Sequence, residues 1–370
     1  MEKRRPDNLV DLFEWSVERH GPNKLFGTKN AAGEYQWVTY DEVAKRVDDL
    51  RAGLASIGVV KGDCVGLIAN NRTEWAVAAF ATFGLGARFV PMYEAELTAT
   101  WKYIIADSGV KVLFVSTPEI LKEVASFRDA VHSLERVYVI DAEGPESMRG
   151  LEEAGRKKPV ASSVPDADDI AVLIYTSGTT GEPKGVLLSH GNFSSNTVDA
   201  GGCFPDLCDE DRSLSILPWA HSYGQTADLY NFINIGGSVA FMGSVQTIVE
   251  DMAMARPTFL VAVPRVFNRV YDGLWAKMDE EGGLPRKLFV MGVEAARKKR
   301  ELAAQGRSSL AADLKYGIAD AIVFKKIRAR FGGRLKGAIT GSAMMNPEIA
   351  HFFSDIGIPT YDCYGLTETS

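Results

Sequence analysis

The sequence predicts an α/β fold built from two sheet-containing lobes. The chain has 370 residues, enough for two or three domains, and its 46% hydrophobic and 24% charged residues are typical of soluble globular proteins. Short apolar runs, typical of buried strands, alternate with segments in which apolar residues recur at helical spacing. This alternation predicts layers of helices on mostly parallel sheets.

The individual elements follow from local patterns. Residues 39–42 form a capping box that starts a helix, because the Thr39 hydroxyl and the Glu42 carboxylate can each accept a backbone N–H. Apolar residues at helical spacing continue this helix until Gly58 ends it. A second helix is predicted from Pro264 onwards. The runs predicted as strands are 64–69, 112–115, 137–140, 170–175, 186–188, 238–242, 259–263 and 336–340.

The lobes are predicted over 60–205 and over 10–58 plus 210–370. The polar stretch 141–169, rich in Pro and Ser, is predicted to be a linker or surface excursion around which the two lobes join. A basic helical insertion is expected over 282–336.

The charge of the chain is unevenly distributed. The net charge of −7 argues against a nucleic-acid partner. The insertion 282–336 nevertheless carries fourteen Lys and Arg against four Asp and Glu. Three interpretations stay open: solvated helices paired with acidic neighbours, a face that docks on anionic lipid, or a site for the phosphates of a ligand.

The most informative segment is YTSGTTGEPKGV at 175–186, which lies between two predicted strands. Glycines let a backbone approach an anion closely, hydroxyls and amides donate hydrogen bonds, and Lys184 adds a positive charge. The segment is therefore predicted to bind phosphate, the alternative being a flexible hairpin with a solvated lysine. It is not a Walker A loop, since the chain has no Gly-Lys pair.

This segment resembles the phosphate loop of the adenylate-forming (AMP-binding) superfamily of acyl-CoA synthetases, luciferases and peptide-synthetase adenylation domains. Further motifs follow in the order of that family: FGLGARFVPMYEA upstream, then LPWAHSYGQ at 217–225, GSA at 341–343 and YDCYGLTETS at 361–370. The resemblance implies the fold of the family's large N-terminal domain, with a ligand cleft between two lobes.

Site residues are assigned partly from chemistry and partly from this resemblance. Lys184 and the hydroxyls of the loop suit the β- and γ-phosphates of ATP, and Glu368 suits Mg²⁺. The resemblance adds Thr179 beside Mg²⁺, Thr367 as a donor to the α-phosphate and Tyr364 as the ring stacked on adenine. The expected ATP or AMP site comprises Thr176, Ser177, Gly178, Thr179, Thr180, Gly181, Lys184, Gly341, Ser342, Ala343, Asp362, Cys363, Tyr364, Gly365 and Thr367; the expected catalytic residues are His221, Lys184, Thr367 and Glu368.

The acid that would be activated is suggested by other segments. His221 occupies the family's histidine position and is expected to orient the carboxylate or gate the acyl tunnel, with Tyr223 and Gly341 also at the acyl group. Residues 263–275 resemble the long-chain fatty acyl-CoA synthetase branch. Apolar and small residues at 232–237 suit a hydrophobic tunnel, and equally an ordinary core.

The expected function is ATP- and Mg²⁺-dependent activation of a long-chain fatty acid, with CoA as co-substrate. The phosphates of CoA are then the ligand meant in the third interpretation of the basic insertion 282–336. Two alternatives stay open: a fatty acyl-AMP ligase that feeds a carrier protein, and a non-catalytic acyl- or nucleotide-binding module. The chain stops after YGLTETS, so the family's C-terminal domain with its catalytic lysine is expected to be absent and the chain not fully active alone. Four scattered cysteines and no secretory signal predict a cytoplasmic protein, with a peripheral membrane contact through 282–336. The oligomeric state is left open.

Overall fold

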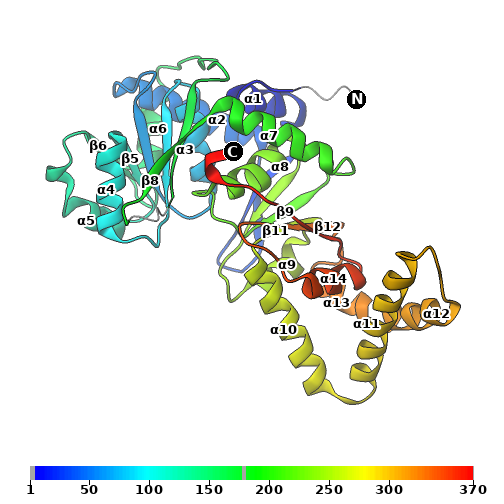
Figure 1. Cartoon of the computed structure of the whole chain (residues 1–370). Coiled ribbons are helices and arrows are strands. Elements are labelled where there is room, and N and C mark those ends of the chain that lie inside the picture. Colours follow the sequence, from blue (N-terminus) through cyan, green and yellow to red (C-terminus); the bar gives the residue numbers. More distant parts are fainter. Residues whose placement is uncertain (1–4, 177–180, 370) are drawn as a thin grey trace.

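The computed structural model describes residues 5–176 and 181–369, which form two β-sheets with helices packed against them (Figure 1). The predicted α/β class is confirmed. All strand pairings in the described residues are parallel except β1 with β2 and β7 with β8. The sheets are therefore mostly parallel, as expected from the strand–helix alternation.

One sheet is built from the middle of the chain. Its strands follow the order β6-β5-β3-β4-β7-β8, and every residue of β3 is buried. The strands are β3 (Cys64–Ile68), β4 (Arg88–Met92), β5 (Val110–Val115), β6 (Arg136–Val139), β7 (Ile170–Thr176) and β8 (Lys184–Ser189).

The other sheet combines strands from both ends of the chain. Its order is β13-β12-β11-β9-β10-β1-β2, so the N-terminal hairpin lies beside strands that come some 200 residues later. The strands are β1 (Lys24–Lys29), β2 (Tyr35–Thr39), β9 (Arg212–Ser215), β10 (Ser238–Phe241), β11 (Phe259–Ala262), β12 (Gly337–Thr340) and β13 (Thr360–Asp362).

The described helices connect these strands and cover the sheets. The α-helices are α1 (Leu9–His20), α2 (Tyr40–Ser56), α3 (Thr73–Phe83), α4 (Thr98–Ser108), α5 (Pro118–Ala125), α6 (Met148–Gly155), α7 (His190–Cys203), α8 (Asn231–Asn234), α9 (Ile248–Ala255), α10 (Pro264–Glu281), α11 (Gly283–Ala303), α12 (Leu310–Ala319), α13 (Lys325–Arg330) and α14 (Pro347–Asp355). Shorter turns are the 3₁₀-helices η1 (Arg128–Ala130) and η4 (Thr367–Thr369) and the π-helices η2 (Gly224–Tyr230) and η3 (Asp320–Phe324).

The capping box predicted at 39–42 is present. The Thr39 side chain accepts from the backbone N–H of Glu42, and the Glu42 carboxylate accepts from the N–H of Thr39 at 2.7 Å. Helix α2 then runs to Ser56, with the predicted apolar residues on its buried face. The prediction works because both signals, the cap and the apolar spacing, are local.

Of the two interpretations of 141–169, the linker between lobes was wrong, and the surface excursion describes only the mostly exposed residues on either side of a helix. The segment joins β6 to β7, which belong to the same sheet, so the two lobes do not meet around it. It also contains α6, whose residues Met148 and Leu151 are buried. Gly155 of α6 packs so closely on α2 that a Cβ atom there would lie 2.0 Å from the carbonyl oxygen of Asp49. Because the segment is polar overall, this amphipathic helix of two turns was not recognised in the sequence.

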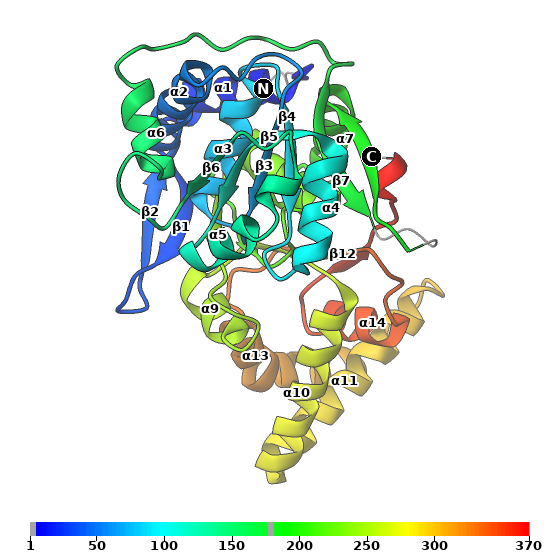
Figure 2. The same cartoon turned by 90° about the vertical axis from the view of Figure 1, so that its left-hand side faces the viewer.

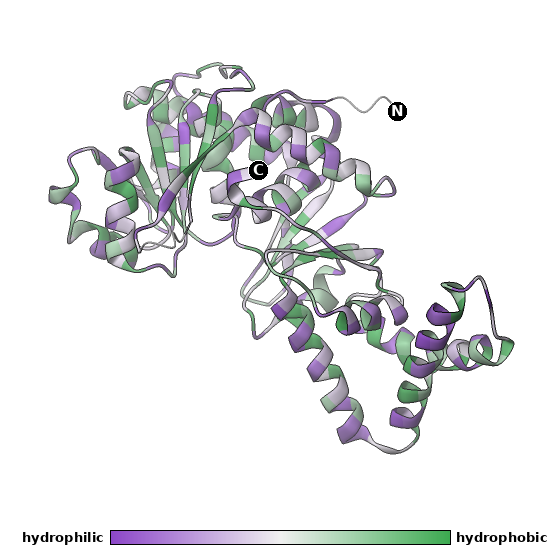
Figure 3. Ribbon diagram, in the orientation of Figure 1, coloured by the Kyte–Doolittle hydropathy of each residue, from purple (hydrophilic) through white to green (hydrophobic). Residues whose placement is uncertain are grey.

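The basic segment forms helices at one end of the molecule. Helices α10 and α11 extend away from both sheets (Figure 2). Helix α12 packs on α11. Hydropathy colouring shows apolar residues concentrated along the strands, whereas α10, α11 and α12 carry apolar and hydrophilic residues side by side (Figure 3).

Candidate active site

Two predicted motifs lie side by side because they follow neighbouring parallel strands. Strands β12 and β13 pair in register, with Thr340 opposite Asp362, and the N–H of Cys363 donates to the carbonyl of Thr340 at 2.7 Å. The segments 341–343 and 363–369 therefore both leave the carboxyl-terminal edge of the sheet. Ligands of open α/β sheets bind at this edge.

The predicted phosphate loop belongs to the hairpin β7–β8 of the other sheet. Thr176 and Lys184 face each other across this antiparallel pair, and Lys184 is exposed. The predicted residues Ser177, Gly178, Thr179 and Thr180 lie outside the described residues. The hydroxyl of Thr176 lies 3.5 Å from the Glu368 carboxylate, although 192 positions separate the two residues. The fold thus brings one end of the predicted phosphate loop to the predicted Mg²⁺ residue.

His221 lies in the loop between β9 and η2. Its Nδ1 accepts a hydrogen bond from the N–H of Tyr223 at 3.1 Å, and burial lowers the pKa of the imidazole because the charged form would lose water. The ring is therefore neutral near pH 7, and its proton lies on Nε2. His221 thus offers one N–H donor to a ligand.

The His221 loop and the segments 341–342 and 363–367 line a cavity of about 470 Å³, whose walls do not include Thr176, Lys184 or Glu368. Its walls include His221, Tyr223 and Gly341, the three residues predicted at the acyl group. A Cβ atom on Gly341 would lie 3.1 Å from the Tyr223 ring, so glycine permits this close approach. Apolar side chains from several elements complete the lining: Phe204, Leu207, Phe232, Ile235, Phe259, Ile339 and Leu366.

The predicted nucleotide residues line the same cavity in part. Ser342, Cys363, Tyr364, Gly365 and Thr367 contribute to its walls. Thr367 is buried, and its hydroxyl lies 3.1 Å from the hydroxyl of Ser222, whereas the ring of Tyr364 is 92% exposed. An exposed ring beside a cavity is available for stacking on a planar ligand.

Ala343 and Asp362 do not line this cavity. Ala343 is exposed, and the Asp362 carboxylate accepts from the backbone N–H of Met345 at 3.4 Å. Ser342, between the two strand ends, has a positive φ of 68°, which costs a non-glycine residue energy and is common at functional sites.

Two residues that hold the His221 loop in place, Asp228 and Asn71, were not predicted from the sequence. Asp228 of η2 is fully buried and accepts from the indole N–H of Trp219 at 3.0 Å and from the hydroxyls of Ser213 and Ser215. A charged residue inside the apolar stretch 227–233 was the signal that could have identified Asp228.

Asn71 fastens the same loop from the other lobe. Its amide nitrogen donates to the carbonyl of Leu217 at 2.6 Å and to the Ser215 hydroxyl at 2.8 Å, and its oxygen accepts from the N–H of Trp219 at 2.8 Å. Asn71 follows β3, about 145 positions earlier, and no local pattern marks it.

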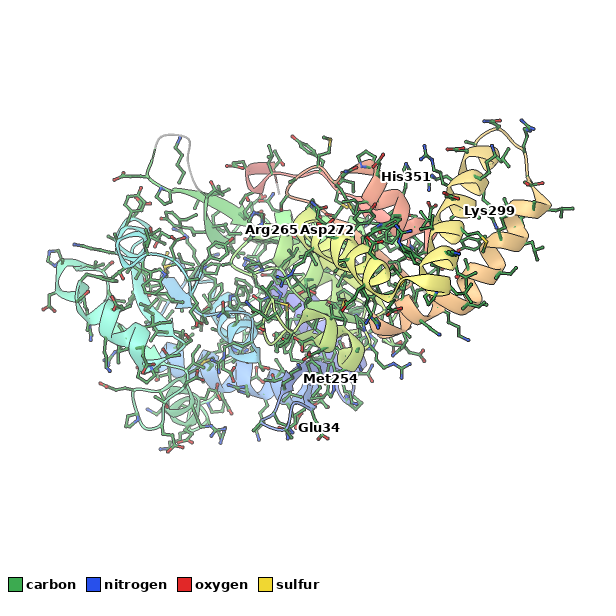
Figure 4. All side chains as sticks on the ribbon, turned by 90° about the horizontal axis from the view of Figure 1, so that it is seen from below. Glu34, Met254, Arg265, Asp272, Lys299 and His351 are labelled. Carbon is green, nitrogen blue, oxygen red and sulfur yellow. The ribbon has the colours of Figure 1, made fainter. Side chains whose placement is uncertain are left out.

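A second cavity of about 790 Å³ lies between α9 and α10. Its apolar wall includes Ile216, Leu217 and Pro218, the residues that lead into the His221 loop. Four cations also line it: Arg265, Arg269, Lys277 and Arg330. Figure 4 shows Arg265 on the first turns of α10. The loop 216–222 thus forms part of the wall of both cavities.

Comparison with known proteins identifies similar chains. The sequence profile of the family described as AMP-binding enzyme matches residues 13–370. Long chain acyl-CoA synthetase 7, peroxisomal, from Arabidopsis thaliana is 32% identical over 98% of this chain and 53% of its own length. The long-chain-fatty-acid–CoA ligase FadD15 of Mycobacterium bovis is also 32% identical, over 98% of this chain and 61% of its own. The chain spans a little over half the length of these relatives.

Solved structures share the fold. The adenylation domain of a carboxylate reductase from Mycobacterium chelonae superposes with a TM-score of 0.77 at 22% identity, over 97% of this chain and 58% of that one. ATP-bound MatB from Rhodopseudomonas palustris superposes with a TM-score of 0.70 at 23% identity, over 98% and 60%.

Proposed function

Because this chain belongs to the AMP-binding enzyme family, we propose that it binds ATP and a fatty acid and joins them as an acyl-adenylate. The observation that carries the proposal is that the tail connects two groups of predicted residues. Residues 363–367 line the same cavity as His221, and Glu368, the next residue, lies 3.5 Å from Thr176 of the β7–β8 hairpin. We propose that the phosphates of ATP lie at this hairpin, beside the acid in the cavity.

In the proposed reaction, a carboxylate oxygen of the acid attacks the α-phosphorus of ATP, and pyrophosphate leaves. Lys184 stabilises the negative charge that builds up on the leaving group. Neutral His221 donates its Nε2–H to the carboxylate and orients it, without taking its proton. Thr367, whose hydroxyl lies beside Ser222, is the proposed donor to the α-phosphate.

The described residues fit Mg²⁺ only as an ion that arrives with ATP. Among them, no group of three or more His, Cys, Asp or Glu side chains could hold a metal. Glu368 supplies one carboxylate, with the Thr176 hydroxyl 3.5 Å away. One or two carboxylates suffice for Mg²⁺ that keeps water and phosphate oxygens as its other ligands. Bound there, the ion would neutralise charge on the phosphates.

A long-chain fatty acid is the proposed substrate. Much of the cavity wall is apolar and includes Phe204, Phe232 and Ile235. Two relatives that match 98% of the chain are named for long-chain acids. Affinity is expected to rise by roughly 0.8 kcal/mol for each CH₂ group that becomes buried, until the cavity is filled.

The test is ATP–pyrophosphate exchange with acetate, octanoate and palmitate, measured on this chain and on longer chains that contain it. We expect the rate at limiting acid to rise with acid length. Lys184→Ala should lower the exchange roughly a hundredfold or more, because a charge-stabilising contact is lost. The exposed Lys157→Ala is the matched control. Equal rates for the three acids, or an unaffected Lys184→Ala variant, would contradict the proposal.

CoA is the proposed acceptor of the acyl group. The second cavity combines an apolar wall with four cations, which suits a molecule that has a long thiol arm and several phosphates. A carrier protein would bring a single phosphate on its arm. The double variant Arg265→Glu/Arg269→Glu should raise the KM for CoA and leave pyrophosphate exchange unchanged; an unchanged KM would favour the carrier-protein ligase.

We also propose a peripheral contact between segment 282–336 and an anionic membrane. Its support so far is the excess of Lys and Arg in this segment. A cytoplasmic location is proposed with it.

A further inference from the structure

Helix α12 carries an apolar stripe on its outer face. Leu310, Leu314, Ile318 and Ile322 follow one another at intervals of four residues, through α12 and into η3. This interval places successive side chains on one side of a helix. The four residues are 89%, 67%, 41% and 45% exposed, respectively. Isolated exposed leucines are ordinary, but a continuous exposed stripe marks an interaction surface.

The fold of the helix does not need this stripe. The opposite face of the same helix already packs on α11: Ala319 and Phe324 are fully buried, and a Cβ atom on Gly292 of α11 would lie 2.5 Å from the Cβ of Ala319. The Phe324 ring also packs against Phe289 of α11, with 6.3 Å between centroids. Helix α12 is therefore apolar on both faces, and only the inner face has a partner in the described chain.

The charges around the stripe are positive. Lys315, Lys325 and Lys326 are exposed, and the ion pairs found within 5–176 and 181–369 include none of them. The two acidic residues of α12 and η3 are already neutralised: Asp313 pairs with Lys299 at 2.8 Å, and Asp320 pairs with Arg328 at 2.6 Å. The face that carries the stripe thus has cations without competing carboxylates.

The cluster 297–300 of α11, the densest basic run of the sequence, is different. Arg297 pairs with Glu301 at 3.0 Å, Lys299 pairs with Asp313, and Arg300 pairs with Asp355 of α14. Lys299 and Arg300 therefore hold α11 to its neighbours, and Arg297 is paired within its own helix. Besides Lys298, the exposed cations beside the stripe that take part in no ion pair among the described residues lie on α12 and α13.

We infer that α12 lies in the surface of an anionic membrane, with its stripe among the acyl chains and its lysines at the headgroups. An interfacial helix needs both signals, apolar area and positive charge, and this face has both. The location fits, because α11 and α12 form the end of the molecule farthest from the six-stranded sheet (Figure 4, Lys299). Among the described residues, no helix combines the length and hydrophobicity needed to cross a bilayer.

A second copy of the chain is a less suitable occupant. A two-fold dimer through this face would bring the same patch against itself. Lys315, Lys325 and Lys326 of one copy would then approach those of the other, and like charges at an interface are destabilising. An anionic lipid surface has the complementary charge. The membrane-surface position of α12 rests on the proposed membrane contact of 282–336, and not on the adenylation chemistry.

The test is sedimentation of the chain with vesicles of phosphatidylcholine alone or mixed with phosphatidylglycerol. Wild type should bind the mixed vesicles and be released in part as salt rises, since salt screens the lysines. Leu310→Ser/Leu314→Ser should lower the partition coefficient about tenfold or more. Leu97→Ser, which removes a 71% exposed leucine before α4, is the matched control and should bind like wild type. Thermal melting verifies that each variant is folded.

The outcomes separate the two proposals. If wild type does not sediment with mixed vesicles, both the membrane contact and the role of α12 are overturned. If wild type binds and Leu310→Ser/Leu314→Ser binds equally well, the contact stands and the stripe is excluded. Light scattering tests whether the stripe binds a second copy of the chain instead. A wild-type dimer that becomes a monomer in the double variant would assign the stripe to that contact. Pyrophosphate exchange is measured separately.

Discussion

His190 is a buried histidine at the first position of α7, and it lines neither of the two cavities described above. Its Nδ1 accepts from the backbone N–H of Leu9 at 3.3 Å, and its ring packs edge-on against Phe83 at 5.3 Å between centroids. Burial lowers the pKa of His190 to about 4, against the weaker opposite effect of Asp169. The N-terminal helix α1 is thus anchored by a neutral imidazole.

The stability of the protein should therefore fall when the pH drops from about 6.5 to 4. In this window the unfolded chain binds a proton at His190 and the folded chain does not. Since one pKa unit corresponds to about 1.4 kcal/mol, the loss approaches roughly 3 kcal/mol at pH 4. Urea unfolding across this range measures it. His190→Gln should remove this part of the pH dependence, whereas the exposed His132→Gln should keep it; equal slopes in both variants would refute the assignment.

At the scale of elements, the contact between α2 and α6 depends on two glycines. A Cβ atom on Gly155 would lie 2.0 Å from the carbonyl oxygen of Asp49 and 2.3 Å from the nitrogen of Gly53. A Cβ atom on Gly53 would lie 2.4 Å from the carbonyl oxygen of Leu151. These neighbours are backbone atoms, so the helices would have to move apart to accept a larger residue.

Gly155→Ala should lower the stability by roughly 1–3 kcal/mol, the range for overpacking a tight contact. Alanine is otherwise the better helix former by about 1 kcal/mol. Gly273→Ala is the matched control, because Gly273 lies inside α10 and a Cβ atom there would meet nothing within 4 Å. We expect the melting temperature to fall for Gly155→Ala and to rise for Gly273→Ala. A rise in both would show that α2 and α6 are not in close contact.

At the scale of the whole molecule, the site lies where the two sheets meet, and Asn71 joins them. It extends from the segment after β3 and bonds Ser215, Leu217 and Trp219 of the other sheet's lobe. Trp219 is in turn fixed by Asp228. The loop that presents His221 is thus held from both lobes, which orients the imidazole before a ligand binds.

Asn71→Ala should weaken binding of the acid and destabilise the protein. The variant leaves the Leu217 carbonyl and the Trp219 N–H without their partner, and a buried group that loses its hydrogen bond costs about 1–3 kcal/mol. Equilibrium binding of the fatty acid and thermal melting measure the two effects. The neighbouring Asn70→Ala removes an exposed amide and should change neither. If both variants behave alike, the hydrogen bonds of the Asn71 side chain are not what orders the His221 loop.

Elements with strong local signals were predicted close to their observed bounds. The run 64–69 became β3 and the run 170–175 became β7, because continuous apolar residues favour a buried strand wherever it lies in the sheet. The run 336–340, apolar only at Ala338 and Ile339, also became a strand, β12. The Thr39 cap and the start of α10 at Pro264 were likewise encoded within a few residues. The resemblance to the AMP-binding family also rested on contiguous strings.

Short strands with mixed composition were missed. Strand β9 has the sequence Arg-Ser-Leu-Ser, and its two serines are buried. They are tolerated there because Asp228, thirteen and fifteen positions away, bonds both hydroxyls. Strand β1 gains its place from pairing with β10, far along the chain, and β2 pairs in turn with β1. A strand that is stabilised mainly by its partner strands need not show a strand pattern in its own sequence.

The site likewise has a part that could be predicted from the sequence and a part that could not. The types of residue that bind phosphate and carboxylate could be read from short motifs, because that chemistry resides in single side chains such as Lys184 and His221. That Thr176 meets Glu368, that Asn71 holds Trp219 and that α12 keeps a bare outer face were decided only by the tertiary structure. Each depends on contacts, or on missing contacts, between segments that lie far apart in sequence, and no local pattern of residues encodes which distant segments will pack together.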